Sequence, residues 1–340
     1  MSTALDASSS SSSSTDSDEE ALSFLQPNCV INNRYLIQDI LGEGRFGVVH
    51  GVFDAYLRQP AVLKVFKEKM CQSGGERNLD HESAQTELRL LREFSRRHPP
   101  GQLMPIPRLF DNGEITVCKP NEDGTNDDGD KGIHTKQTNS ISNEHKDETA
   151  IVARSVKYQY LILQRLGPTV DRIQEQFGGQ LPLGLCVQFT VGAVSALEFL
   201  HRNGWVHCDV KGNNIAVGDG RTSHVNCLYL IDFGRSKRVL DRQGQFLPPV
   251  GYQKYGGPLW YTSLRGHLKQ DLCFGDDLQA ALYLLVHSYK GGLPWLYCMD
   301  PALVYAMKRS TPDEYIYAQC PPRWLEASLH ARKSISFVSH

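Results

Sequence analysis

Two short polar motifs, separated by one apolar strand, constrain the fold of this chain more than any other feature. The first is His207-Cys208-Asp209-Val210-Lys211-Gly212-Asn213-Asn214, and the second is Asp232-Phe233-Gly234, which begins eighteen residues after Asn214. The second motif directly follows Leu228-Tyr229-Leu230-Ile231, which has the composition of a short buried strand. This pattern predicts that a polar loop and the end of a strand face one cleft.

The side chains of these motifs suit phosphoryl transfer from a magnesium nucleotide. Asp209 can orient an acceptor hydroxyl and take its proton, and Lys211 can neutralise charge on the moving phosphoryl group. Asn214 and Asp232 offer two oxygen ligands for Mg²⁺. His207 is expected to be structural, packing under the loop and hydrogen-bonding the backbone.

A glycine-rich segment, Gly42-x-Gly44-x-x-Gly47, lies between two predicted strands at 35–40 and 61–66. Its position between strands argues against a dinucleotide fold and favours a hairpin whose backbone amides close over phosphates. Glycine suits this task, because a Cβ would keep the backbone away from the anion. A plain hairpin turn explains these glycines equally well.

Lys64 lies in the second of these strands, flanked by apolar residues. A lysine there either pairs with an acid or extends its ammonium to water. Glu87, in an amphipathic helix predicted over 83–94, is the favoured acid, and Glu82 is its competitor. The alternative is an edge-strand lysine in solvent. A Lys64–Glu87 pair would hold the lysine against the α- and β-phosphates of ATP.

A chain of 340 residues is long enough for one large two-lobed domain or two ordinary ones, and its composition predicts polar segments before and within the folded part. A serine-rich and acidic stretch opens the chain, and such a composition cannot bury enough apolar surface to become ordered. Order is expected to begin near Tyr35, and the helical part is expected to contain a face from Leu185 to Leu200 and a buried helix over 278–286. The expected boundaries are a disordered tail at 1–30, a domain at 35–325 with a β-rich N-lobe at about 35–163, a polar insertion at about 116–150, a helical C-lobe at about 167–325, and an uncertain tail at 326–340.

Other classes of protein are disfavoured by composition. The formal net charge of −2 gives no reason to expect a nucleic-acid partner. No apolar run is expected to span a bilayer, and the N-terminus has no signal pattern. The nine cysteines include no Cys-x-x-Cys pair, which suggests neither a zinc site nor a disulfide framework. We therefore expect a cytoplasmic or nuclear protein with no membrane partner.

In combination, these motifs resemble those of the eukaryotic protein kinases. The finer match is to the casein kinase 1 group, including its tau-tubulin kinase and vaccinia-related kinase branches, and it covers about Tyr35 to Trp295. The stretches that carry it are the hinge-like Leu163-Gln164-Arg165-Leu166-Gly167-Pro168, then Asn214-Ile215-Ala216-Val217-Gly218, Tyr261-Thr262-Ser263, Asp276-Asp277-Leu278 and Gly292-Leu293-Pro294-Trp295.

The resemblance implies a bilobal α+β fold, an ATP site, and Mg²⁺ bound by Asn214 and Asp232. Leu163 would be the gatekeeper, and the backbone of Leu166 would hydrogen-bond the adenine edge. Ala216 would lie below the adenine. The nucleotide-binding residues implied in this way are Leu41, Gly42, Gly44, Gly47, Val49, Val62, Lys64, Glu87, Leu163, Leu166 and Ala216.

The same resemblance implies a catalytic set of Asp209, Lys211 and Asn214. Asp277 would anchor the loop that carries them. The position of Lys211, two residues after Asp209, is the arrangement of the serine/threonine kinases. Protein serine or threonine hydroxyls would therefore be the acceptors.

Departures from the family pattern carry their own expectations. Cys208 replaces an arginine, so activity should not depend on phosphorylation of the activation loop. Pro258 and Trp260 stand where the family has threonine and arginine, so a preference for primed substrates is not expected. Forty-five residues follow Trp295, fewer than the family's closing helices need, which predicts a truncated C-terminal lobe.

The expected function is that of a serine/threonine protein kinase. The rival hypothesis is a pseudokinase that binds nucleotide or a partner protein without catalysis, which Pro258 and the short C-terminal segment favour. The rival is opposed by an intact set of catalytic and nucleotide-binding residues, namely Lys64, Glu87, Asp209, Asn214 and Asp232. An unstable truncated product is a third hypothesis.

Overall fold

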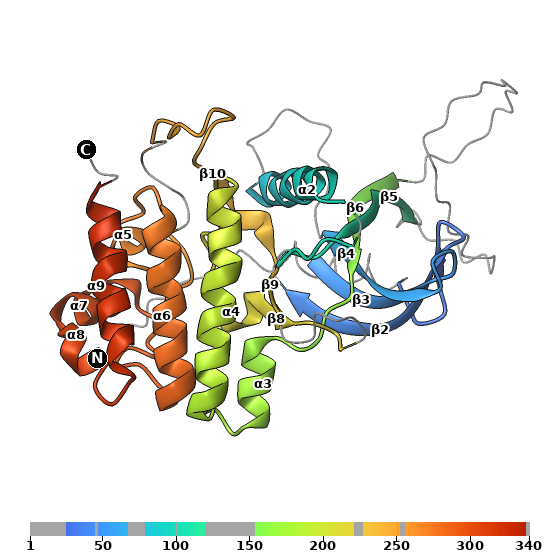
Figure 1. Cartoon of the computed structure of the whole chain (residues 1–340). Coiled ribbons are helices and arrows are strands. Elements are labelled where there is room, and N and C mark those ends of the chain that lie inside the picture. The colour runs from blue at the N-terminus through green and yellow to red at the C-terminus, as the bar shows by residue number, and fades with distance from the viewer. Residues whose placement is uncertain are drawn as a thin grey trace, which may run out of the picture. The chain divides into compact units, whose positions relative to one another are not determined.

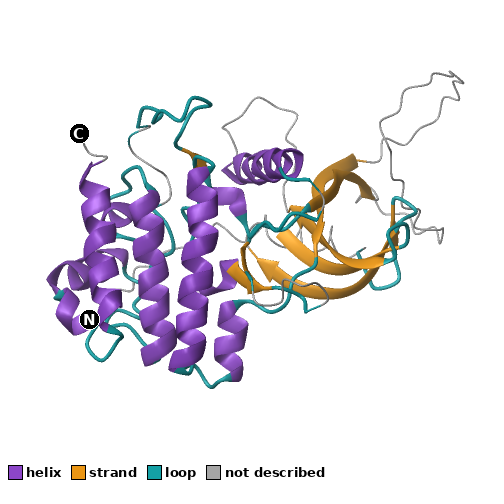
Figure 2. Ribbon diagram, viewed as in Figure 1, coloured by secondary structure: helices purple, strands orange, loops and turns teal. Residues whose placement is uncertain are grey.

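The chain folds into two compact units, one β-rich and one mainly helical (Figures 1 and 2). The first unit comprises Met1–Ala84 and Leu109–Arg165, and the second comprises Gln85–Arg108 and Leu166–His340. The α+β fold class predicted from the sequence is confirmed. The computed structural model describes residues 25–44, 47–66, 79–99, 101–119, 154–220, 227–249, 251 and 256–337.

The first unit is built on a curled, six-stranded antiparallel sheet with strand order β1-β2-β3-β4-β6-β5 (Figure 1). Successive residues of a strand point to opposite faces of a sheet. In β4 this alternation buries Ala61, Leu63 and Val65 completely on one side. The strands are β1 (Val30–Ile31), β2 (Tyr35–Gly44), β3 (Gly47–Asp54), β4 (Gln59–Phe66), β5 (Leu109–Lys119) and β6 (Arg154–Gln164).

The sheet extends further than its sequence pattern indicated. Order begins before Tyr35, because Leu25 and Ile31 are buried and β1 pairs with β2. β5 continues to Lys119, so strand replaces the first residues of the predicted polar insertion, while residues 120–153 lie outside the described part of the chain. Most of the predicted N-terminal tail, residues 1–24, also lies outside it.

The second unit is organised around α6, which is buried almost all round, as its continuous apolar sequence predicted. α6 packs against α4 on one side and α9 on the other. The helices of four or more residues are α2 (Leu79–Arg97), which begins in the first unit, then α3 (Val170–Gln176), α4 (Leu183–Arg202), α5 (Leu264–His267), α6 (Phe274–Lys290), α7 (Pro301–Ser310), α8 (Asp313–Ile316) and α9 (Pro322–Phe337).

The loop regions of this unit contain short strands and single 3₁₀ turns. β8 pairs antiparallel with β9, and β7 pairs with β10. These elements are β7 (Trp205–Val206), η1 (Gly212–Asn214), β8 (Ile215–Val217), β9 (Leu228–Leu230), η2 (Phe233–Arg235) and β10 (Lys237–Arg238).

α4 corrects one expectation from the sequence. Among the described helices it is the one long and apolar enough to cross a membrane. Length and composition do not separate such a span from the core helix of a folded unit, and α4 packs against α6 and β9. Its buried face includes Cys186 in place of the predicted Leu185.

The C-terminal region contains more helix than the sequence suggested. Three helices, α7 to α9, follow Trp295 in the described residues. The last of them continues to Phe337, through much of the segment left as an uncertain tail. Its packing against α6 includes the buried side chains of Trp324 and Ala331.

Candidate active site

The loop that carries the first polar motif is held by the carboxylate of Asp277 on α6. Oδ2 accepts the backbone N–H of His207 at 2.7 Å, and Oδ1 accepts that of Cys208 at 2.9 Å. His201 on α4 also approaches Oδ2, with Nε2 at 2.9 Å. Because Asp277 is only 2 % exposed, each of these charge-assisted bonds forms away from water. Asp277 therefore contacts the loop as the resemblance implied.

Asp209 lies at the centre of the motif and is 1 % exposed. Its Oδ2 accepts hydrogen bonds from Nζ of Lys211 at 3.1 Å and from Nδ2 of Asn214 at 3.0 Å. Asn214 Nδ2 also donates to the backbone carbonyl of Asp209 at 2.9 Å. One carboxylate is thus oriented by an ammonium and an amide, while the side chain of Lys211 remains 32 % exposed.

His207 is fixed by the backbone on both sides of its ring. Nε2 donates to the carbonyl of Ile231 at 3.1 Å, and Nδ1 accepts the backbone N–H of Asp209 at 3.3 Å. The ring also packs against Phe233, with 5.3 Å between centroids. The structural role predicted for His207 is confirmed.

The short β8–β9 ladder places the two candidate metal ligands beside each other. The backbone N–H of Ile231 donates to the carbonyl of Asn214 at 3.0 Å, so Asp232 follows directly at this end of the ladder. Asp232 has a left-handed backbone, with φ of 63°. Nδ2 makes the side-chain bonds of Asn214, which leaves its Oδ1 for a cation. An amide oxygen and a carboxylate fit Mg²⁺, a hard cation that prefers oxygen ligands.

These two residues would not form a complete metal site by themselves. Within the described residues, no group of three or more histidine, cysteine, aspartate or glutamate side chains is placed to hold a metal ion. Mg²⁺ is commonly bound through one or two protein groups plus substrate phosphates and water. The donor set therefore fits an ion that arrives with a nucleotide.

The connector after β6 runs alongside β8. The N–H of Gly167 donates to the carbonyl of Val217 at 2.9 Å, and the N–H of Val217 donates to that of Pro168 at 3.0 Å. Thr169 forms a bridge with Ala216, which is 2 % exposed. Leu166 and Ala216, predicted separately as adenine contacts, are thus brought to one part of the second unit.

Asp171 is a site-adjacent carboxylate that the sequence did not reveal. A Cβ added to Gly212 would lie 1.6 Å from Asp171 Oδ1, so the carboxylate lies directly against the loop. Burial and then the charge of Glu175 raise the pKa of Asp171, against the opposing effects of Lys211 and the N–H of Asn213. Asp171 lies on α3, far before the motif that begins at His207, so no local spacing in the sequence links the two.

The segment at 257–263 is fastened to the start of α6. Ser263 Oγ donates to Oδ1 of Asp276 at 2.6 Å, and the N–H of Cys273 donates to Oδ2 at 2.7 Å. Burial raises the pKa of Asp276. Arg265 Nε lies 3.7 Å from the same carboxylate. Asp276 thus ties this segment to α6 as Asp277 ties the preceding loop.

Lys308 supports the same segment from α7. Its Nζ donates to the carbonyls of Leu259 at 3.1 Å and Thr262 at 2.7 Å. The ammonium lies 5.3 Å from the ring centroids of Tyr283 and Trp295, where the negative faces of the rings attract it. Burial lowers the pKa of Lys308 well below its usual value. Sequence analysis did not single out this lysine.

Trp260 and Pro258, the two residues of this segment that depart from the family pattern, both form hydrogen bonds within the chain. Trp260 donates Nε1–H to the carbonyl of Cys298 at 2.9 Å and accepts the indole N–H of Trp295 at 2.8 Å. The carbonyl of Pro258 accepts the N–H of Thr262 at 2.7 Å. The indole N–H of Trp260 is therefore engaged with the chain itself.

The first unit presents a separate set of predicted residues on one face of its sheet. Val49 pairs with Lys64, Lys64 with Leu161, and Val62 with Leu163. Directly opposed residues of an antiparallel pair share a face, so these residues lie on the side away from the buried Leu63 and Val65. Leu41, in contrast, is exposed by 43 %.

The glycines of the hairpin between β2 and β3 differ in the space that surrounds them. A Cβ at Gly47 would lie 2.1 Å from the carbonyl oxygen of Val65, so close strand packing requires glycine there. A Cβ at Gly42 would meet no described atom within 4 Å. Gly44 pairs with Gly47, and Arg45 and Phe46 lie outside the described residues.

Lys64 and its predicted acidic partner belong to different units. Lys64 is 9 % exposed, and its Nζ lies 5.2 Å from the ring centroid of Phe66. Glu87, in the second unit, is 1 % exposed, whereas its competitor Glu82 is exposed. Burial distinguishes the two acids, and the Lys64–Glu87 pair stays a prediction.

Comparison with known proteins gives partial matches to serine/threonine protein kinases. A probable serine/threonine-protein kinase of Dictyostelium discoideum is 31 % identical over 183 residues, which cover 53 % of this chain and 36 % of that protein. A probable casein kinase I homolog of Encephalitozoon cuniculi is 33 % identical over 148 residues, 43 % of this chain and 44 % of that protein. The serine/threonine-protein kinase spe-6 of Caenorhabditis elegans is 31 % identical over 143 residues, 42 % and 37 % respectively.

These relatives support the kinase family and agree with a kinase-like α+β fold, a curled antiparallel sheet followed by a helical unit. The chain spans less than half the length of each of the three relatives. No protein-family model matches the chain.

Proposed function

We propose that this chain is a serine/threonine protein kinase that transfers the γ-phosphate of ATP to protein hydroxyls. The observation that carries the proposal is the buried carboxylate of Asp209, oriented by Lys211 and Asn214 in a loop held by Asp277. Catalysis of this kind depends mostly on positioning and on stabilising charge. A fixed carboxylate beside a partly exposed ammonium provides both.

In this proposal Asp209 accepts the hydrogen bond of the acceptor hydroxyl and takes its proton. Lys211 stabilises the charge that develops on the transferred group. Asp171, close to Lys211, helps to set the position of that lysine. Mg²⁺, held by Asn214 and Asp232 together with the nucleotide, would neutralise phosphate charge.

The first unit would bind the nucleotide. Val49, Val62 and Leu163 form an apolar face suited to adenine, and Lys64 supplies a positive charge on the same face. The open space at Gly42 supports this assignment, because no described atom of the protein explains a need for glycine there. Glu87 is proposed to orient Lys64, since a buried carboxylate requires a partner.

A finer assignment to the casein kinase 1 group, near its tau-tubulin and vaccinia-related branches, is also proposed. Its support is the motif at 163–168, the small Ala216 and the segment at 261–263, together with the match to a probable casein kinase I homolog. The buried thiol of Cys208 supports activity that is independent of activation-loop phosphorylation, because no cationic side chain stands there.

A phosphate-transfer assay tests the proposal. Asp209→Asn and Lys64→Met are each expected to abolish incorporation of labelled phosphate into casein. Lys157→Met, which replaces an exposed lysine of β6, is the matched control and should retain transfer. Thermal unfolding would verify that every variant is folded. Transfer at the wild-type rate by both Asp209→Asn and Lys64→Met would refute the proposal.

The rival function is nucleotide binding without catalysis. Pro258 favours it, because proline has no hydroxyl at a position where the resemblance has threonine. Both functions predict stabilisation by Mg-ATP, by about 2.7 kcal/mol at a hundredfold excess over Kd. Stabilisation of the wild type with no transfer to casein or to a degenerate peptide library would favour the rival.

A further inference from the structure

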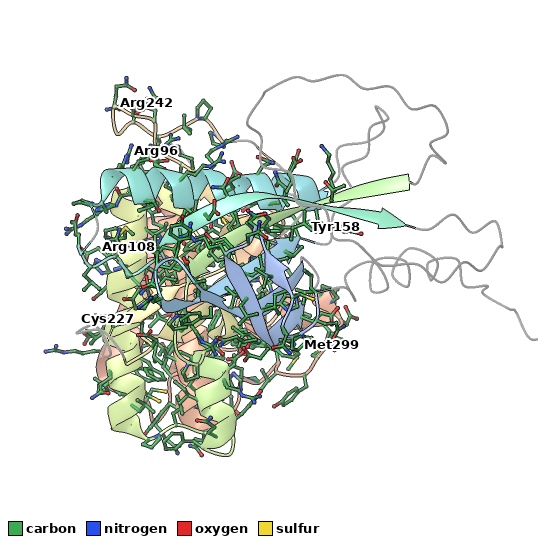
Figure 3. All side chains as sticks on the ribbon, turned by 90° about the vertical axis from the view of Figure 1, so that its right-hand side faces the viewer. Arg96, Arg108, Tyr158, Cys227, Arg242 and Met299 are labelled. Carbon is green, nitrogen blue, oxygen red and sulfur yellow. The ribbon has the colours of Figure 1, made fainter. Side chains whose placement is uncertain are left out.

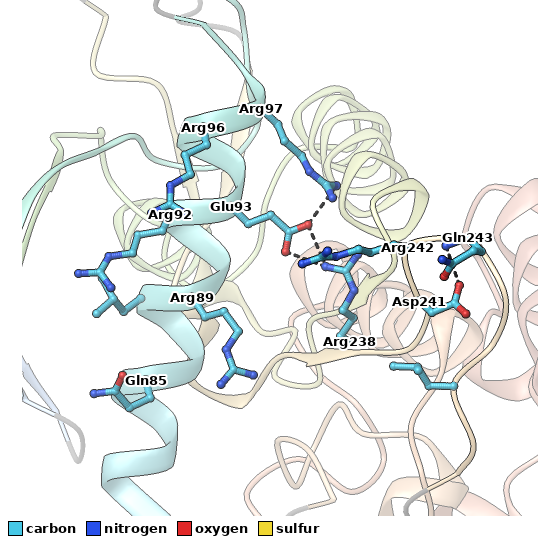
Figure 4. A pocket seen from close by; sticks show the side chains of 12 residues that line it. Gln85, Arg89, Arg92, Glu93, Arg96, Arg97, Arg238, Asp241, Arg242 and Gln243 are labelled. Atoms are coloured by element: carbon cyan, nitrogen blue, oxygen red, sulfur yellow. Dashed lines mark hydrogen bonds and ion pairs between the residues drawn. The ribbon is translucent and has the colours of Figure 1, made fainter.

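A pocket of about 830 Å³ lies in the second unit, outside the candidate active site. One of its walls is a face of α2, and the other is the turn that follows β10 (Figure 4). Two carboxylates line it, those of Glu93 and Asp241. Its cationic residues outnumber them, and they are Arg89, Arg92, Arg96, Arg97, Arg238 and Arg242.

The helical repeat explains why these arginines gather. Arg89, Arg92 and Arg96 follow one another at spacings of three and four residues, which places them along one side of α2. The opposite side of the helix is buried through Leu91 and Phe94. The arginine side therefore remains exposed while the helix is fixed by its apolar side.

The two walls are joined by Glu93. Nη1 of Arg238 lies 2.8 Å from Oε1 and 2.7 Å from Oε2 of this carboxylate, and Arg97 Nη1 lies 3.0 Å from Oε1 (Figure 4). Asp241 uses its Oδ1 to accept the backbone N–H groups of Gln243 and Gln245. Both carboxylates of the pocket are therefore already engaged.

The remaining positive charge is not balanced by the pocket. Arg89, Arg96 and Arg242 are exposed, and their side chains make no hydrogen bond or ion pair with another described residue. Arg242 extends from the turn toward α2, and Arg89 lies on the side of α2 that faces the turn (Figure 4). Figure 3 shows Arg96 and Arg242 on the same side of the molecule. Guanidinium groups from two walls thus surround one concave space.

We propose that this arginine pocket binds a phosphoserine-bearing segment of a partner protein. Guanidinium groups pair with phosphate through two parallel hydrogen bonds, and clusters of arginine are a recurring means of phosphopeptide recognition. A phosphoserine carries more charge and one more acceptor oxygen than a carboxylate. Three arginines free to reorient can engage such a group from both walls.

Nucleic acid fits the pocket less well than a phosphopeptide. Sequence-tolerant binding of single strands relies on aromatic side chains on which bases stack. The described residues that line the pocket include no aromatic side chain, and the chain as a whole has a formal net charge of −2. The local charge is therefore suited to a short anionic segment.

Fluorescence anisotropy with a short peptide carrying two phosphoserines in an uncharged background tests the inference. Arg89→Glu/Arg96→Glu should weaken binding at least about tenfold, equivalent to about 1.4 kcal/mol. Arg309→Glu/Arg323→Glu, which changes charge equally at two exposed arginines outside the pocket, should leave the affinity within about twofold. Thermal unfolding would verify that both double variants remain folded.

Each other outcome would overturn the inference. The first is equal binding by the pocket variant and the wild type. The second is equal binding of the phosphorylated peptide and of its unphosphorylated or glutamate-substituted form. The third is displacement of the labelled peptide by a single-stranded oligonucleotide at a lower concentration than the unlabelled phosphopeptide requires. The assay contains no ATP, so it is independent of phosphate transfer. A failed transfer assay with intact phosphopeptide binding would contradict the proposed function alone.

Discussion

Asp277 Oδ1 accepts the backbone N–H of Cys208 at 2.9 Å, and Cys208 has a φ of 63°. The bond holds a non-glycine residue in the left-handed region, which is unfavourable for most side chains. The same carboxylate holds the preceding residue of the loop. The course of the loop therefore depends on α6.

Replacing Asp277 by asparagine is expected to destabilise the second unit. The amide can accept at one atom, but its NH₂ group would face a donor, leaving a buried N–H unsatisfied. We expect a loss of about 2–4 kcal/mol in the free energy of unfolding, measured with urea. Glu198→Gln removes an exposed ion pair with Arg202 and should cost less than about 1 kcal/mol. Equal losses in both variants would contradict the anchoring role of Asp277.

Gly212→Ala is expected to destabilise the loop because its new methyl group would overlap Asp171. The carboxylate must move, at a cost of about 1–3 kcal/mol. The same change in an Asp171→Ala background should cost less, which a double-mutant cycle would measure. Gly184→Ala serves as control, since a Cβ there meets no described atom within 4 Å. An additive cycle would show that Gly212 and Asp171 do not interact.

Stability should depend on pH through His267. Burial, and next the charge of Lys308, lower the pKa of His267 from 6.5 to about 4. The unfolded chain binds a proton near pH 6.5, whereas the folded chain does not until about pH 4, so the free energy of unfolding falls as the pH decreases between these values. The loss should reach at most about 3 kcal/mol.

The variant His267→Leu should remove this contribution. The difference in urea stability between variant and wild type is therefore expected to change between pH 6.5 and 4. Leu268→Ala, at an exposed residue next to His267 that does not titrate, should keep the wild-type pH dependence. Parallel curves for wild type and His267→Leu would rule out the titration of His267 as the cause.

Lys308→Met should loosen the segment at 257–263. The carbonyls of Leu259 and Thr262 lose their donor, at an expected cost of about 1–3 kcal/mol. Hydrogen exchange of the backbone amides in this segment should accelerate more than exchange in α4. Lys333→Met, at an exposed lysine, should leave both rates unchanged. Unaltered exchange in the Lys308 variant would contradict the supporting role.

Local patterns made much of the fold predictable. The apolar residues on both sides of Lys64 predicted the strand β4, and the continuous apolar run at 278–286 predicted the central helix α6. The motif spacing also anticipated that Asp209 and Asn214 come together, because a single loop contains both residues. These features depend on neighbours in sequence, which a period of two or 3.6 residues reveals.

The residues that hold the candidate site in place from distant segments could not be predicted from local sequence patterns. Lys308 contacts Leu259 and Thr262 across more than forty residues, and nothing in its own segment distinguishes it from a surface lysine. Asp171 reaches Gly212 only because the connector runs along β8. The arginine pocket likewise joins α2 to a turn far along the chain. Such contacts arise from tertiary packing, for which one sequence carries no periodic signal.

The pairing of β3 with β4 couples the packing of the sheet to the placement of Lys64. A slip by one residue would turn Leu63 and Val65 outward and Lys64 inward, exchanging every side chain between the faces. The slipped sheet would lose its apolar interior and would also displace Lys64 from the face that it shares with Val49. The burial of Leu63 and Val65 therefore opposes strand slippage, and the same burial fixes the face of the sheet on which Lys64 lies.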